Sequence, residues 1–254
     1  MLAIAGGKGG CGKTTTACGL SLALAARGRC PVVVDGDVDM PDLHERIGAA
    51  PDPGLDELAE GEPLEDVLQR DHDLPGVGIV ATGEREALGS AVDRLSRLDP
   101  PVLVDCPAGA GRDVARSVRA ADRTVVVSTD TRASLEDAAK TAAMSRTLGT
   151  PVACLVLRET PTRGSPESDD RLRHLVEADR IVRVPTYQGN NVLATIRAAV
   201  HLGTGVRASA TRPTGGERTG GFGALAGTLY GPASGPDSGW KRRLRRSVGR
   251  RDAV

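Results

Sequence analysis

The sequence predicts an α/β fold of three layers, in which helices cover both faces of a mostly parallel central sheet. Three observations support this prediction. Short apolar runs alternate with helix-like segments through the first 202 residues. Runs such as Val32–Val34 and Val125–Val127 do not alternate with polar residues, which is typical of strands buried on both faces. Regular alternation of strands and helices also indicates right-handed crossovers between parallel strands.

Seven strands are expected in chain order, each a short apolar run. They are Leu2–Ala5, Pro31–Asp35, Gly76–Ala81, Pro101–Asp105, Arg123–Ser128, Pro151–Leu157 and Ile181–Val184. Between them, apolar residues recur at helical spacing, for example Leu135, Ala138 and Ala142 before Gly149. A glycine directly after such a segment is a typical helix stop.

The composition excludes several classes of protein. With 39% hydrophobic and 26% charged residues, the 254-residue chain is ordinary for a globular protein and not for a disordered one. No apolar run approaches the roughly 18–20 residues of a membrane span, and no secretory signal opens the chain. The five cysteines include no C-x-x-C pair, which disfavours a disulfide framework or a zinc knuckle. We therefore expect a protein of the reducing cytoplasm.

The charge is divided between two parts of the chain. From Gly203 onward, ten basic residues outnumber three acidic ones, whereas the first 202 residues hold 23 basic and 30 acidic residues. Residues 203–239 contain 22 glycine, proline, serine and threonine residues among 37. We expect a folded domain over 1–202, a flexible linker over 203–239 and a basic segment over 240–251. Phe222, Leu225 and Leu229 fall at helical spacing, but five surrounding glycines disfavour a helix there.

The strongest motif is a glycine-rich loop between the first strand and the first helix. Its residues, all expected to bind nucleotide, are Gly7, Lys8, Gly9, Gly10, Cys11, Gly12, Lys13, Thr14 and Thr15. They fit G-x-x-x-x-G-K-[ST], whose backbone N–H groups cradle phosphates at a helix N-terminus. In this P-loop NTPase pattern, Lys13 neutralises the β- and γ-phosphates and Thr14 ligates Mg²⁺.

Lys8 is an extra lysine at the start of this loop. With it, the sequence K-G-G-C-G-K-T-T resembles the deviant Walker A motif of the MinD/ParA family. The resemblance implies that Lys8 contacts the nucleotide of the facing subunit in an ATP-sandwich dimer. It would then act in trans, as an arginine finger does.

Two further stretches are similar to the same family. The stretch from Val32 to Leu43 contains Asp35 and Asp37 and looks like the family's switch I. The resemblance implies that Asp37 orients the attacking water and the metal shell, and that Asp35 supports that shell. Leu103–Gly109 resembles Walker B and switch II, and its D-x-P-A-G form is similar to MinD. There Asp105 is expected to bind Mg²⁺ through water, and Gly109 to let the loop rearrange.

The base contacts are expected after the last core strand. No N-K-x-D guanine signature is present, which favours ATP over GTP. Family members wrap the adenine with backbone at a place that matches residues 184–189, so Pro185 and Tyr187 are expected to contact the base. The asparagine often found after the preceding strand is missing, and Arg158 and Glu159 stand there instead.

As a helix, the C-terminal segment would have a narrow apolar stripe, with lysine and arginine on most of the remaining surface. Trp240, Leu244 and Val248 fall at i, i+4 and i+8, among seven basic residues between 241 and 251. Such a segment favours an interfacial membrane anchor that becomes helical on an anionic surface. A nucleic-acid contact and a merely solvated basic tail are the alternatives.

Together these features predict a MinD-like ATPase that dimerises on ATP·Mg²⁺ and binds membrane reversibly through its tail. It would be cytoplasmic and peripherally membrane-associated, would hydrolyse ATP slowly until a partner protein stimulates it, and would position a division or polar assembly. The alternative is a ParA-like partition ATPase that binds nonspecific DNA. A nucleotide sensor without hydrolysis also fits the motifs, whereas a metallochaperone relative would need ligand cysteines that the sequence lacks.

Overall fold

The structure is a computed structural model of the 254-residue chain, and it describes residues 1–41, 43, 47, 49–159, 169–178, 180–184, 208–209 and 221–230. Eight strands occur in these residues: β1 (Leu2–Gly6), β2 (Val32–Asp35), β3 (Gly78–Val80), β4 (Val102–Ala108), β5 (Arg123–Thr129), β6 (Val152–Arg158), β7 (Ile181–Val184) and β8 (Ala208–Ser209). The helices are α1 (Lys13–Ala25), α3 (Leu55–Glu60), α4 (Leu64–Val67), α5 (Arg85–Leu95), α6 (Arg112–Ala120), α7 (Arg132–Thr147), α8 (Asp169–Val176) and α10 (Gly221–Tyr230).

The strands form one sheet in the order β3-β2-β4-β1-β5-β6-β7-β8. The first seven strands in sequence pair in parallel, and β8 pairs antiparallel with β7 at the edge. All seven strands expected from the sequence are present, with ends shifted by no more than three residues. The predicted mostly parallel sheet is therefore confirmed.

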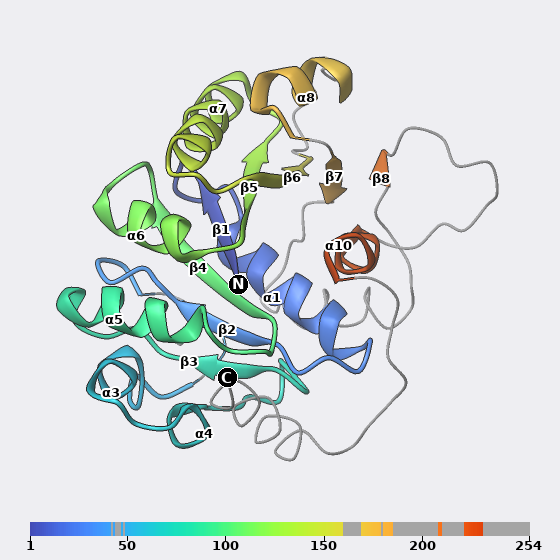
Figure 1. The fold of residues 1–254 in the computed structure, drawn as a ribbon. Helices are drawn as coiled ribbons and strands as arrows, with labels where there is room; N and C mark the ends of the chain where they lie inside the picture. The colour runs from blue at the N-terminus through green and yellow to red at the C-terminus, as the bar shows by residue number, and fades with distance from the viewer. Residues whose placement is uncertain are drawn as a thin grey trace, which may run out of the picture.

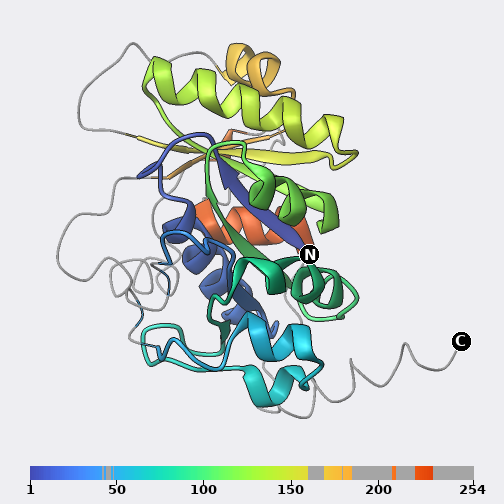
Figure 2. The same cartoon turned by 90° about the vertical axis from the view of Figure 1, so that its left-hand side faces the viewer.

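Helices cover both faces of the sheet and complete three layers (Figures 1 and 2). Alternate residues of β1 show the division, because Leu2 and Ile4 pack with α1 and α10, whereas Ala3 and Ala5 pack with α5 and α6. Further along the sheet, α7 and α8 cover β5, β6 and β7 on the α6 side. Both faces are buried, which explains the uninterrupted valine runs.

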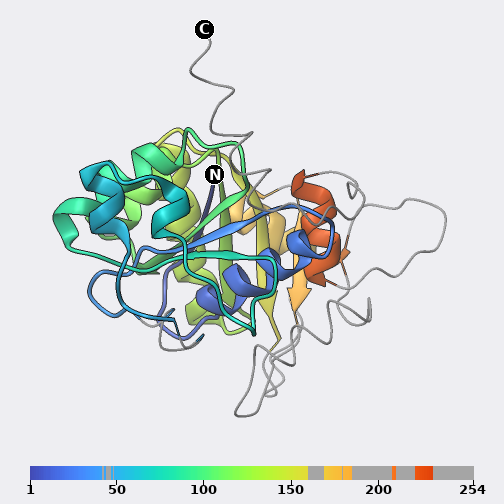
Figure 3. The same ribbon diagram turned by 90° about the horizontal axis from the view of Figure 1, so that it is seen from below.

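Helix α10 corrects one expectation from the sequence. Its residues fall inside the region assigned to a flexible linker, yet they pack beside α1 on the sheet (Figures 1 and 3). Phe222, Leu225 and Ala226 are buried in the same core cluster as β1 and α1. Arg29 donates from Nη2 to the carbonyl oxygen of Tyr230 at 2.8 Å, which satisfies a group at the C-terminal end of the helix. Burial of this apolar face outweighs the low helix propensity of the glycines.

The carboxyl ends of β1, β2, β4 and β6 converge at one edge of the sheet, where ligands bind in open α/β folds. Asp105 lies in register with Ile4 on one side and with Asp35 on the other. The loops that carry the sequence motifs therefore meet at this edge. Among the described residues, no helix combines the length and apolarity that a membrane crossing requires.

Candidate nucleotide site

The glycine-rich loop turns directly from β1 into α1. Gly10 and Gly12 have φ values of 75° and 101°, in the left-handed region that glycine adopts without strain. Gly12 is the N-cap of α1 and has no side chain that could bond the first-turn N–H groups. The positive end of the helix dipole at this point favours an anion. Lys13, with 9% of its surface exposed, opens the helix at this point.

A cavity of about 400 Å³ opens over the loop. Six residues of the loop and the start of α1 line it, namely Gly9, Gly10, Gly12, Lys13, Thr14 and Thr15. The other lining residues come from three further strand ends: Asp37, Met40 and Pro41 after β2, Asp105, Cys106 and Ala108 in β4, and Arg158 in β6. The cavity thus gathers the phosphate loop and both acidic motifs predicted from the sequence.

The three predicted aspartates have different positions. Asp37 and Asp105 line the cavity, and Asp105 is only 3% exposed. Asp35 does not line it but lies behind the loop, where its two oxygens accept the N–H groups of Asp37 at 3.1 Å and Leu43 at 3.2 Å. Asp35 therefore holds the loop that carries Asp37, which fits the supporting role expected for it more closely than direct metal ligation.

The oxygen atoms in the cavity are of the kind that Mg²⁺ prefers. The hydroxyl of Thr14 and the carboxylates of Asp37 and Asp105 are hard donors, and Mg²⁺ takes a few such ligands together with water and phosphate oxygens. The residues present therefore fit a magnesium ion bound with a nucleoside polyphosphate. Asp37 is held in place, since its Oδ1 accepts the N–H of Met40 at 3.1 Å.

Three loop residues predicted to bind nucleotide do not line the cavity. A Cβ atom on Gly7 would lie 2.6 Å from the carbonyl oxygen of Asp137, so this glycine lets the loop approach α7 closely. Cys11 is 2% exposed, and burial raises the pKa of its thiol, opposed by the charge of Lys13. Lys8 is exposed, and no carboxylate in the described ranges forms an ion pair with it.

The loops after β2 and β4 are joined by one arginine. Arg85, the first residue of α5, forms ion pairs with Asp39 after β2 and with Asp113 in the first turn of α6. Asp113 is 7% exposed and also faces Arg116 at 3.5 Å. In addition, Gly109 has a φ of 90° and donates from its N–H to the carbonyl oxygen of Gly6 at 3.3 Å. The phosphate loop and both acidic loops therefore form one connected edge.

Several site residues were not predicted as ligands from the sequence. Met40, Pro41, Cys106 and Ala108 line the cavity as neighbours of predicted residues. Burial raises the pKa of the Cys106 thiol to about 12, with a smaller contribution from Asp105, so the thiol is neutral and fills space. Arg158 reaches the cavity from β6, and the only signal in the sequence was its position in place of the expected asparagine.

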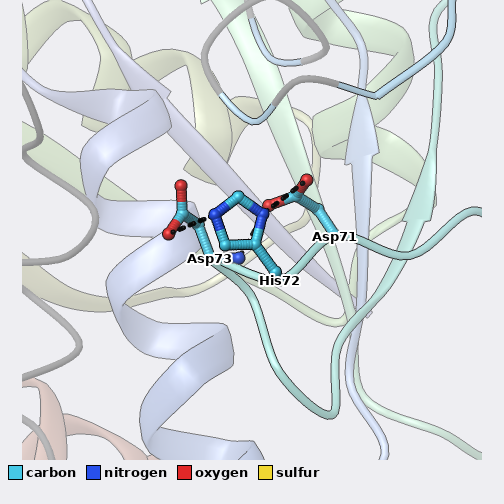
Figure 4. Close-up of side chains that lie close together, drawn as sticks. All are labelled: Asp71, His72 and Asp73. Carbon is cyan, nitrogen blue, oxygen red and sulfur yellow. Dashed lines mark hydrogen bonds and ion pairs between the residues drawn. The ribbon is translucent and has the colours of Figure 1, made fainter.

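Some predicted residues lie outside the described part of the chain. These are Pro185 and Tyr187, expected at the base, and Trp240, Leu244 and Val248, expected at a membrane. Figure 4 shows a separate surface group, in which His72 lies between Asp71 and Asp73, with ion-pair distances of 3.5 Å and 3.4 Å. Contacts between these sequence neighbours account for the arrangement, and His72 is 83% exposed.

Comparisons with known proteins agree with this geometry. The sequence model of the CobQ/CobB/MinD/ParA nucleotide binding domain matches residues 2–204. An uncharacterised ATP-binding protein of Methanocaldococcus jannaschii is 29% identical over 203 residues, which cover 72% of this chain and 73% of that protein. The antiactivator FleN of Pseudomonas aeruginosa is 34% identical over 151 residues, covering 54% of this chain and 53% of FleN.

Solved structures show the same fold. The septum site-determining protein MinD of Pyrococcus horikoshii, complexed with Mg-ADP, matches with a TM-score of 0.62 at 21% identity and covers 79% of this chain and 94% of that one. A MinC:MinD cell division protein complex from Aquifex aeolicus matches with a TM-score of 0.63 at 20% identity, covering 84% and 99%. With the domain match over residues 2–204, the chain belongs to the CobQ/CobB/MinD/ParA family of nucleotide-binding domains.

Proposed function

We propose that the protein is a MinD-like ATPase that works as a nucleotide-timed switch. ATP·Mg²⁺ binds over the glycine-rich loop, with Lys13 at the β- and γ-phosphates and Thr14 at the metal. Asp37 orients the attacking water, and Asp105 supports the metal through water. The observation that carries this proposal is the convergence of Lys13, Asp37 and Asp105 on one cavity. Fixed charges around a transferring phosphoryl group supply most of its catalysis.

Lys8 completes the site of a facing subunit in this proposal. It is exposed and does not line the cavity, whereas its sequence neighbour Gly9 does, and this position supports a contact with the nucleotide of a partner. A cation that arrives only when two protomers meet makes hydrolysis depend on dimerisation.

The paired C-terminal segments then hold an anionic membrane. At roughly 1 kcal/mol for each basic residue near the surface, seven charges set an upper limit of about 7 kcal/mol before ordering costs. One tail is therefore a weak anchor, whereas two tails on one dimer bind more tightly through effective concentration. Hydrolysis separates the dimer and releases both tails. A stimulating protein sets the rate, and a division or polar assembly is the cargo.

Sedimentation of the chain with ATP·Mg²⁺ and with ADP tests the dimer. ATP should roughly double the mass from 26.3 kDa, and Lys8→Ala should remain a monomer that still binds nucleotide. Lys140→Ala is the matched control, because Lys140 is a 72% exposed lysine paired with Asp137 on α7. An ATP dimer that persists in Lys8→Ala would refute the trans role.

A further inference from the structure

Arg158 occupies a place where a cation is unusual unless an anion accompanies it. It ends β6, two strands away from β1, and its side chain extends back to the start of α1. A Cβ atom on Gly12 would lie 3.2 Å from the Nη1 of Arg158 and 3.4 Å from its Cδ. The guanidinium therefore lies beside the N-cap of α1 and lines the same cavity as Lys13 and Thr14.

Arg158 forms no ion pair within the part of the chain that the structure describes, although Asp37 and Asp105 line the same cavity. Its Nε is buried and has no hydrogen-bond partner, and no carboxylate in these ranges forms an ion pair with it. The adjacent Glu159 lies 4.0 Å from Arg183 on β7 instead. An arginine stays charged at any accessible pH, and a partly buried charge without a partner is costly. An anion bound in the cavity would give this charge a partner.

We propose that Arg158 binds the phosphate chain of the nucleotide in cis. This inference rests on the proposed nucleotide site and adds a residue to it. The guanidinium offers N–H donors in a planar fork that matches phosphate oxygens. Its Nη1 lies beside Gly12, the N-cap of α1, where the positive end of the helix dipole favours an anion.

The base is a poorer partner for this side chain. The edge of adenine presents a donor beside an acceptor, which an amide matches with both of its groups, whereas a guanidinium only donates. A guanidinium at this position therefore suits the charge of phosphate better than the edge of the base. The site then holds two cations of its own chain, Lys13 and Arg158, before Lys8 of a partner arrives.

Calorimetric titration with ADP·Mg²⁺ and GDP·Mg²⁺ tests the assignment on the full chain. Arg158→Ala should weaken both nucleotides by the same factor, about 10- to 100-fold, as expected for loss of a charge-assisted hydrogen bond. Arg158→Lys, which keeps the charge but not the planar fork, should recover part of the affinity, and the dependence of binding on salt should be weaker in Arg158→Ala. Arg183→Ala is the control, since Arg183 is a half-buried arginine of the same sheet that does not line the cavity.

Unchanged ADP affinity in Arg158→Ala would overturn the proposal, as would a loss confined to ADP, which would indicate a base contact. Arg158→Gln, which keeps the aliphatic stem, decides the question if Arg158→Ala does not fold. If the unaltered chain binds neither nucleotide, the proposed function itself fails. If the unaltered chain and Arg158→Ala bind ADP with equal affinity, only the proposed role of Arg158 is refuted.

Discussion

Gly19, in the interior of α1, should behave against the usual rule for helix glycines. Replacing such a glycine with alanine normally stabilises a helix by about 0.5–1 kcal/mol. At Gly19 the added Cβ would lie within 2.7 Å of three ring carbons of Phe222 in α10. Overpacking of this kind costs about 1–3 kcal/mol. We therefore expect Gly19→Ala to lower the free energy of unfolding by about 1–2 kcal/mol, a fall of about 2–8 °C in Tm.

Gly89 in α5 provides the matched control, because a Cβ atom there would meet nothing within 4 Å. Gly89→Ala should stabilise the protein by about 0.5–1 kcal/mol. Urea unfolding followed by circular dichroism measures both variants. In a Phe222→Ala background, Gly19→Ala should no longer destabilise, since the ring that it meets is gone. If Gly19→Ala and Gly89→Ala stabilise equally, α10 does not pack on α1 and the reasoning is wrong.

Two further perturbations test the edge of the sheet and its core. Arg85→Ala removes one partner of the buried Asp113 and should lower the free energy of unfolding in urea by about 1–2 kcal/mol. The carboxylate of Asp39 is 66% exposed, so Asp39→Ala should cost less than about 0.5 kcal/mol. Equal costs would contradict the role of Arg85 as a bridge. Burial raises the pKa of the Cys106 and Cys154 thiols from 9.0 to about 12, so the folded state keeps protons that the unfolded state loses. The free energy of unfolding should therefore fall above about pH 9 by about 1.4 kcal/mol per pH unit for each thiol. Urea titrations at several pH values measure this fall, and Cys154→Ala should make it shallower. A free energy of unfolding that does not change between about pH 9 and 10.5 would contradict the prediction.

Much of the sheet could be predicted because its strands are buried on both faces. Each such strand is a continuous apolar run, and the signal depends only on residues adjacent in sequence. The phosphate loop could be predicted equally well, because Gly12, Lys13 and Thr14 are consecutive in the sequence. Asp37 and Asp105 could be placed at the site because one follows β2 and the other lies toward the carboxyl end of β4, and these strand ends meet.

The features that the sequence analysis missed depend on contacts between distant residues. Helix α10 has five glycines in and around it and reads as a linker until Phe222 is seen to pack over Gly19, some 200 positions earlier. The helix is stabilised by tertiary contacts, so helix propensity alone predicts a linker there. Arg158 was noticed as a departure from a family pattern, but its reach across β5 to Gly12 follows from the sheet order.

The switch itself is tested most directly by co-sedimentation of the full chain with anionic liposomes, in ATP·Mg²⁺ and in ADP, with duplex DNA as competitor. We expect the protein to pellet with the liposomes in ATP, also when DNA is present, and to stay in solution in ADP. Replacement of both Trp240 and Leu244 with glutamate should abolish pelleting and leave ATP hydrolysis unchanged. Equal pelleting in ATP and ADP, or capture of DNA in place of lipid, would contradict the membrane switch. DNA capture would instead favour a partition ATPase.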